Sequence, residues 1–255
     1  MKVAVSGAMG RLGSVIAHGI SNTNELQLTG AYAPGLAGKT VAGIEVDDSQ
    51  EKVDAQIMVE CTHPDVVMVN LKKWHAKGMF VVAGTSGFTE VRIAELKSFW
   101  GEDDPACLIA PNFSIGAVLM MRFAEMASPY FDSAEIIERH EDSKPDAPSG
   151  TALATAMRIG KNRTSAEQKD STEVVSGARG GLISGVHVHS LRMKGLLSDQ
   201  EVAFSNKGEI FSIHHSSTSY ESFVNGALLA IRYVKTIKGV EIGLDAALDF
   251  EAKNI

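Results

Sequence analysis

Residues 3–13 read Val3-Ala-Val-Ser-Gly7-Ala-Met-Gly10-Arg11-Leu-Gly13, an apolar run followed by three glycines at the spacing G-x-x-G-x-x-G. The run predicts a buried strand, and apolar residues at helical spacing over 11–21 predict a helix directly after it. Glycine permits a tight turn and a close approach of the backbone to a pyrophosphate, and the start of a helix attracts phosphate. The segment therefore predicts a dinucleotide site, with Gly7, Met9, Gly10, Arg11 and Leu12 as its binding residues.

The rest of the first half alternates continuous apolar runs with helical stretches. Strands are predicted at 26–32, 57–61, 80–83 and 108–110, and helices at 64–77 and 90–100. Apolar strands separated by helices are typical of a parallel sheet covered on both faces. We therefore expect an α/β fold with a Rossmann-type parallel sheet.

The second half has a different pattern. A helix at 117–126, a strand at 134–139 and a polar loop at 141–148 precede a helix that starts near Ser149, and residues 161–185 are polar and glycine-rich, which predicts a loop. Runs at 186–193, 200–205 and 209–215, separated by turn-like segments, predict an antiparallel arrangement. A last helix near 223–238 carries an apolar stripe. We expect two domains, residues 1–113 plus 221–255 and a smaller α+β domain at 114–220 with a mixed or antiparallel sheet.

The net charge and the composition of the chain limit the classes of binding partner that we expect. The formal net charge is -7 and the chain has no basic run, so we expect neither a nucleic-acid nor a membrane partner. No apolar stretch has the length of a membrane span, and the chain begins with a strand and turn where a leader would have an apolar region, so we expect a cytoplasmic location. His187 and His189 share one face of a predicted strand, but no further ligands follow at metal spacing, and no metal site is expected.

The end of the second strand bears on coenzyme choice. An acid there normally holds the ribose hydroxyls and favours NAD. The chain has Ala31-Tyr32-Ala33-Pro34 at this point, with neither an acid nor an obvious replacing arginine. The choice between NADH and NADPH stays open. Two roles are open for Arg11: it binds a phosphate of the coenzyme, or it is a solvated residue at the start of the helix.

Residues 138–152 carry the candidate chemistry. They read Glu138-Arg-His140-Glu141-Asp-Ser-Lys144-Pro-Asp-Ala-Pro-Ser149-Gly150-Thr151-Ala152. His140 ends a strand and can donate a proton near neutral pH. Lys144 can hold a carboxylate or stabilise developing negative charge. Ser149 is a good N-cap, and the N–H groups of Gly150 and Thr151 in the first helical turn form an anion site.

This segment resembles the signature of the dihydrodipicolinate reductase family, E-x-H-H-x-x-K-x-D-A-P-S-G-T-A. The resemblance covers nearly the whole chain. Besides the opening glycine turn, it includes Cys61-Thr62-His63-Pro64, Gly84-Thr85-Ser86-Gly87-Phe88, Ala110-Pro111-Asn112-Phe113-Ser114-Ile115-Gly116, the run Gly177-Ala-Arg-Gly180, and the strand at 186–192.

The resemblance implies reduction of 4-hydroxy-tetrahydrodipicolinate with NADH or NADPH in lysine and diaminopimelate synthesis, by a homotetramer. It implies that His140 is the proton donor, that Lys144 binds or polarises the substrate, and that Ser149, Gly150 and Thr151 hold a substrate carboxylate. The nicotinamide end would be lined by Gly84, Thr85, Pro111, Asn112 and Phe113. The domain at 114–220 would bind substrate and form the oligomer.

Two positions depart from the family pattern. The second histidine of the signature is Glu141 here, and the arginine that the family has shortly before its asparagine/proline-glycine is Tyr220. Losing an arginine removes a bidentate carboxylate partner, for which His214 and His215 are candidate replacements. Three hypotheses stay open: the lysine-pathway reductase, a related reductase of another cyclic imine, and a nucleotide-sensing relative that has lost turnover.

Overall fold

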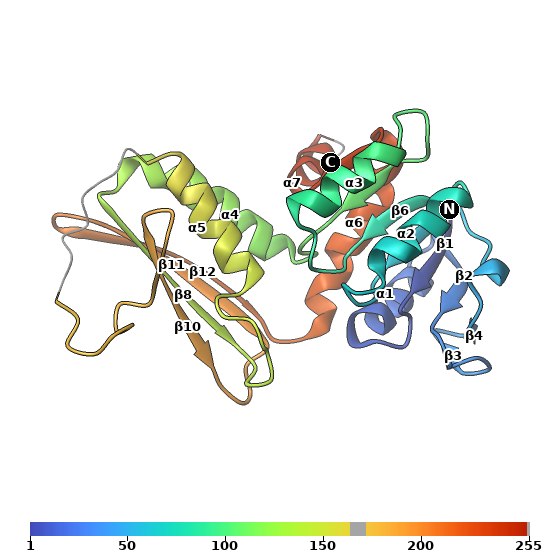
Figure 1. Ribbon diagram of the computed structural model, residues 1–255, viewed down its shortest axis with the longest axis horizontal. Coiled ribbons are helices and arrows are strands. Elements are labelled where there is room, and N and C mark those ends of the chain that lie inside the picture. The colour runs from blue at the N-terminus through green and yellow to red at the C-terminus, as the bar shows by residue number, and fades with distance from the viewer. Residues whose placement is uncertain (164–171, 254–255) are drawn as a thin grey trace. The chain divides into compact units, whose positions relative to one another are not determined.

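A computed structural model describes residues 1–163 and 172–253 (Figure 1). The chain separates into two compact units. Unit 1 comprises Met1–Ile115 and Tyr220–Ile255, and unit 2 comprises Gly116–Ser219. None of the helices in the described ranges has both the length and the apolar character that crossing a bilayer requires.

Unit 1 is built on an eight-stranded sheet with the order β13-β7-β6-β5-β1-β2-β4-β3. All neighbouring pairs are parallel except β3 with β4 at one edge, so the expected Rossmann-type sheet is confirmed. The strands are β1 Lys2–Ser6, β2 Gln27–Tyr32, β3 Thr40–Val41, β4 Ile44–Asp47, β5 Ile57–Glu60, β6 Phe80–Ala83, β7 Cys107–Ile109 and β13 Val240–Ile242. The sequence pattern did not predict β3, β4 or β13, because β3 has two residues and a glutamate interrupts the apolar residues of β4 and β13.

The helices of unit 1 are α1 Arg11–Ser21, α2 Val67–Ala76, α3 Glu90–Phe99, α6 Val224–Tyr233 and α7 Asp245–Ala252, with 3-10 turns η1 Gln50–Lys52, η3 Tyr220–Phe223 and η4 Val234–Thr236. The predicted helix at 11–21 has the same bounds as α1. Helix α6 packs on α1, where a Cβ on Gly19 would lie 2.3 Å from Val224 Cγ1. The C-terminal segment thus completes the unit that the N-terminal segment begins.

The order of the strands fixes where a ligand can bind in unit 1. The chain passes from β1 to β2 on one side of the sheet and continues with β5 on the other side of β1. In open parallel sheets the ligand crevice lies at the carboxyl ends of the strands, where the strand order reverses. The glycine turn follows β1 at this point.

Unit 2 has a five-stranded sheet with the order β12-β11-β8-β10-β9. Its elements are α4 Ile115–Ala127, the 3-10 turn η2 Ser128–Tyr130, β8 Ser133–His140, α5 Gly150–Lys161, β9 Gly181–Ile183, β10 Val186–Arg192, β11 Ser198–Asn206 and β12 Glu209–Ser217. Helices α4 and α5 lie together beside the sheet (Figure 1), and α5 contacts β8, β9 and β10.

The expected α+β unit with a mixed or antiparallel sheet is confirmed, and two details differ from the prediction. The runs at 186–193 and 200–205 are not neighbours, because β8 lies between β11 and β10 and pairs in parallel with β10. Strand β9 lies within the predicted loop at 161–185, where pairing with β10 outweighs the polar composition. Residues 164–171 of that loop lie outside the described residues.

Strand β8 alternates strictly between half-buried and buried residues. Successive side chains on a strand point to opposite faces, so Glu138 and His140 share the buried face. Glu135 and Arg139 lie on the opposite face. The carboxyl end of β8 thus places a carboxylate and an imidazole side by side beneath the start of α5.

Candidate active site

The glycine turn of unit 1 leaves no room for side chains at two of its glycines. Gly7 has φ +76°, and a Cβ there would lie 2.7 Å from the Cys61 carbonyl oxygen. A Cβ on Gly13 would lie 2.2 Å from the Gly7 carbonyl oxygen. The N-cap of α1 is Gly10, which has no side chain that could cap the first helical turn. The turn and helix start therefore fit a pyrophosphate, which would accept hydrogen bonds from the N–H groups there.

The end of β2 supports this turn through its backbone. The Tyr32 carbonyl accepts hydrogen bonds from Gly7 N–H at 2.9 Å and Ala8 N–H at 3.1 Å. Those two amides are therefore already used within the fold, and we expect phosphate at the start of α1. Tyr32 itself packs edge-on against Trp74.

Tyr220 lies next to the glycine turn. The Arg11 guanidinium carbon is 5.4 Å from the centroid of the Tyr220 ring, within the range of a cation–π contact. The residue at the family's arginine position therefore contacts a predicted coenzyme-binding residue in unit 1.

The predicted nicotinamide-end residues follow two neighbouring strands, β6 and β7. A Cβ on Gly84 would lie 2.2 Å from the Phe113 ring, so only glycine fits against that ring. Thr85 is buried and its hydroxyl donates to the Glu60 carbonyl at 3.3 Å, while Asn112 Oδ1 accepts from Ser114 N–H at 2.8 Å. With Pro111, these residues form one group at the carboxyl edge of the sheet.

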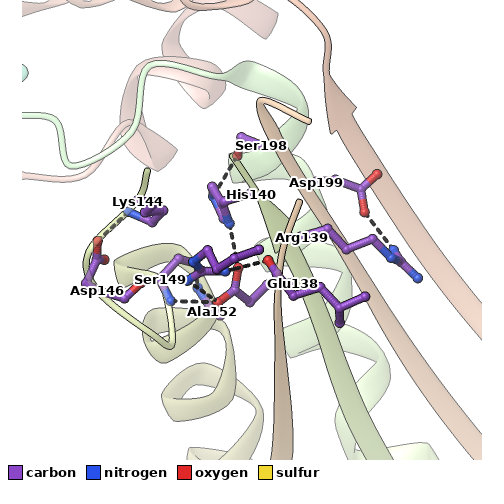
Figure 2. A network of polar contacts seen from close by, with 11 residues as sticks. Glu138, Arg139, His140, Lys144, Asp146, Ser149, Ala152, Ser198 and Asp199 are labelled. Atoms are coloured by element: carbon purple, nitrogen blue, oxygen red, sulfur yellow. Dashed lines mark hydrogen bonds and ion pairs between the residues drawn. The ribbon is translucent and has the colours of Figure 1, made fainter. Parts of the chain in front are cut away.

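In unit 2, His140 forms a short hydrogen bond with Glu138. Its Nδ1 lies 2.5 Å from Glu138 Oε2, and its Nε2 lies 3.1 Å from Ser198 Oγ (Figure 2). The Glu138 side chain is fully buried, and His140 is 9% exposed. One imidazole edge is therefore bound to a carboxylate and the other to a hydroxyl.

Arg192 binds the same carboxylate from β10. Its two terminal nitrogens each donate to a different Glu138 oxygen at 2.9 Å, and Nη2 also donates to the Asp146 carbonyl at 2.5 Å. The Ser149 N–H donates to Glu138 Oε1 at 3.2 Å. Glu138 thereby joins the end of β8, the Lys144 loop and the start of α5.

These donors keep Glu138 ionised. Burial opposes ionisation, but the hydrogen bonds from His140 and Arg192 outweigh it and lower the pKa of Glu138 from 4.5 to about 2. An ionised carboxylate accepts hydrogen bonds and cannot donate them.

The loop and helix start behave as predicted in their local structure. Ser149 is the N-cap of α5, and its hydroxyl accepts from Ala152 N–H at 3.2 Å. Gly150 and Thr151 form the first turn of that helix. Lys144 Nζ lies 2.7 Å from Asp146 Oδ1, a half-exposed carboxylate that an anionic ligand could replace.

Comparison with known proteins identifies the family. A family profile described as dihydrodipicolinate reductase, N-terminus, matches residues 1–113, and one described as dihydrodipicolinate reductase, C-terminus, matches residues 116–248. The chain belongs to the dihydrodipicolinate reductase family. It is 43% identical to 4-hydroxy-tetrahydrodipicolinate reductase of Streptomyces griseus, over 98% of each chain. It is 41% identical to the protein of that name from Mycobacterium marinum, over 98% of this chain and all of the other.

A solved structure agrees with this assignment. Dipicolinate-bound dihydrodipicolinate reductase from Paenisporosarcina sp. TG-14 matches with a TM-score of 0.81 and 32% identity, over 96% of this chain and 98% of that one. As a dihydrodipicolinate reductase family member, the chain is an oxidoreductase that uses NADH or NADPH, which confirms the coenzyme class expected from the glycine turn.

Glu138, Arg192 and Ser198 were not predicted as site residues from the sequence. The signal for Glu138 was its position two residues before His140 in a strand, which places both on one face. Arg192 and Ser198 carried no comparable signal because they come from two other strands, Arg192 to bind Glu138 and Ser198 to bind His140. Within the described ranges, no group of three or more His, Cys, Asp or Glu side chains is arranged to hold a metal ion.

Proposed function

We propose that the chain catalyses the NAD(P)H-dependent reduction of 4-hydroxy-tetrahydrodipicolinate to tetrahydrodipicolinate, in cytoplasmic lysine and diaminopimelate synthesis. The relatives that are 41–43% identical over nearly their whole length carry the name of this activity. One observation supports the proposal most directly. The buried carboxylate of Glu138 binds His140 and the start of α5, and through Arg192 it is connected to the loop that contains Lys144.

The proposed chemistry needs a hydride and a proton. The bound coenzyme supplies the hydride, and His140 supplies the balancing proton from its side chain. Water leaves the hydroxylated substrate before the conjugated cyclic imine is reduced. Hydride addition increases electron density on the ring, so a nearby cation such as Lys144 stabilises the transition state.

The proposed substrate is a dicarboxylate, and the site offers two anion partners. Lys144 exchanges its contact with Asp146 for a substrate carboxylate. The capped start of α5 presents Ser149, Gly150 and Thr151 to a carboxylate, which the helix dipole attracts. Local positive groups of this kind serve an anionic substrate even though the whole chain is acidic.

The functional division that we propose follows the domain ranges 1–113 plus 221–255 for the coenzyme and 114–220 for substrate and assembly. The outer face of the unit 2 sheet carries half-buried ionic pairs, among them Arg139 with Asp199 at 2.6 Å and Glu135 with His189 at 2.9 Å. His214 also binds Asp199 there, at 2.6 Å. We propose that this face assembles a homotetramer, which light scattering would register as about four times 27.2 kDa.

The deciding assay follows loss of reduced-coenzyme absorbance with enzymatically generated 4-hydroxy-tetrahydrodipicolinate, run in parallel with NADH and NADPH. Rapid loss supports the proposed substrate and establishes the coenzyme preference. Coenzyme binding without turnover would refute the proposed substrate and favour the alternative, a reductase of another cyclic imine, for which the change to Glu141 is the motivation. The assembled proton donor at His140 argues against a sensor without turnover.

A further inference from the structure

The contacts around His140 determine which nitrogen of the neutral ring carries the proton. Glu138 is ionised and only accepts hydrogen bonds, so the hydrogen in its 2.5 Å contact with His140 belongs to Nδ1. The other ring nitrogen, Nε2, is then unprotonated in the neutral ring and accepts a hydrogen bond from Ser198 at 3.1 Å. A proton gained by His140 can enter only at Nε2.

The carboxylate is itself fixed in place. Its two oxygens accept hydrogen bonds from both terminal nitrogens of Arg192, from Ser149 N–H and from His140, and the Ser190 side chain is a further donor. A fully buried carboxylate with a bidentate arginine partner has little freedom to rotate. The orientation of the imidazole therefore depends on β10 and the start of α5 as well as on its own strand.

Resting on the proposed function, we propose that Glu138, held by Arg192, is a positioning residue that keeps the neutral His140 protonated on Nδ1 and so makes Nε2 the atom that delivers the proton to substrate. Ser198 holds Nε2 in line while no substrate is present. In the balanced reaction, the bond from Nε2 to its proton breaks, the proton joins the substrate that has accepted the hydride, and His140 returns to the neutral form that Glu138 selects.

The charged groups near His140 come from three elements. They are Glu138 on β8, Arg192 on β10, and Lys144 and Asp146 on the loop, with Glu141 next to His140 in the sequence. Strand β11 contributes the neutral Ser198, and its Asp199 lies on the opposite face with Arg139 (Figure 2). Among these, Glu138 is the group hydrogen-bonded to the ring, so its removal has the largest effect on the protonated imidazole.

The first test needs no substrate, and it observes the protein with its site unaltered. Long-range proton–nitrogen NMR spectra of the full-length protein distinguish the two neutral tautomers, and the His140 signals are assigned by their loss in His140→Asn. We expect neutral His140 with a proton on Nδ1 and none on Nε2. A neutral His140 protonated on Nε2 overturns the inference, whichever substrate the enzyme reduces.

The second test is kinetic and uses Glu138→Gln. We expect kcat to fall by about 10²- to 10³-fold, within the contribution of general acid catalysis, with little change in the KM for coenzyme. The alkaline limb of the pH profile of kcat should move to lower pH, because the protonated imidazole loses its ionised partner. Glu25→Gln, at an exposed position before β2 in unit 1, is the control and should keep the wild-type profile.

Further outcomes distinguish failure of the variant to fold, failure of the positioning role and failure of the proposed substrate. If Glu138→Gln does not fold, Ser198→Ala replaces it, since that change keeps the ion pair between Glu138 and Arg192. Loss of the hydroxyl should alter the Nε2 signal and leave Nδ1 protonated. An unchanged tautomer and pH profile in Glu138→Gln would overturn the inference. Wild-type Nδ1 protonation without turnover of 4-hydroxy-tetrahydrodipicolinate would support the positioning role and refute the proposed substrate.

Discussion

Replacing Glu138 with glutamine should remove a large part of the acid sensitivity of unit 2. The carboxylate has an ordinary pKa of 4.5 in the unfolded chain and about 2 in the fold. Because the folded pKa is the lower one, Glu138 stabilises the fold above pH 4.5, and this contribution is lost as the pH falls toward 2. At about 1.36 kcal/mol for each pKa unit, the full contribution is about 3 kcal/mol.

By pH 3 most of this stability is already lost. Linkage between the two pKa values gives a loss of about 2 kcal/mol between pH 7 and pH 3 for the wild type, which Glu138→Gln lacks because its amide does not titrate. Other carboxylates with lowered pKa, such as Asp199 and Glu135, titrate in both proteins and cancel in the comparison.

The assay is urea unfolding of both proteins at pH 7 and pH 3. Both tryptophans, Trp74 and Trp100, lie in unit 1, so tryptophan fluorescence follows unit 1 and serves as the internal control, while far-UV circular dichroism follows both units. We expect the free energy of unfolding of unit 2 to fall by about 2 kcal/mol more in the wild type than in Glu138→Gln. An equal loss in the two proteins would refute the assignment of Glu138 as an ionised, hydrogen-bonded carboxylate.

Three other substitutions test separate parts of the site. Gly13→Ala places a Cβ 2.2 Å from a backbone oxygen and should weaken NADPH binding at least about tenfold by fluorescence titration, while Gly181→Ala, which faces open space, should not. Lys144→Ala removes a charged partner that is worth about 1.5–3 kcal/mol, so the substrate KM should rise about 10- to 150-fold while coenzyme still binds; unchanged kinetics would exclude Lys144 from the site. Tyr220→Ala removes a contact to Arg11 worth about 0.5–1 kcal/mol, which steady-state kinetics should register as about a 2- to 5-fold rise in coenzyme KM; a rise in substrate KM alone would contradict the placement of Tyr220.

The sequence by itself determined the fold class and the local parts of the site. The apolar runs predicted the central strands of the parallel sheet, and α1 begins and ends at the predicted residues. The cap at Ser149 and the glycine turn were also predictable, because helix starts and tight turns depend on residues within a few positions of one another.

The contacts that hold His140 depend on the pairing of distant strands. Arg192 binds Glu138 and Ser198 binds His140, each more than 50 residues from its partner in sequence, and they meet because β8 lies between β10 and β11. Periodicity reports which face of a strand is buried, but it does not report which strands are neighbours. The contact of Tyr220 with Arg11 was likewise not predictable from periodicity, because it joins the N-terminal and C-terminal segments that fold together in unit 1. Local patterns thus fixed the elements, while the pairing of distant strands fixed the partners of the proton donor.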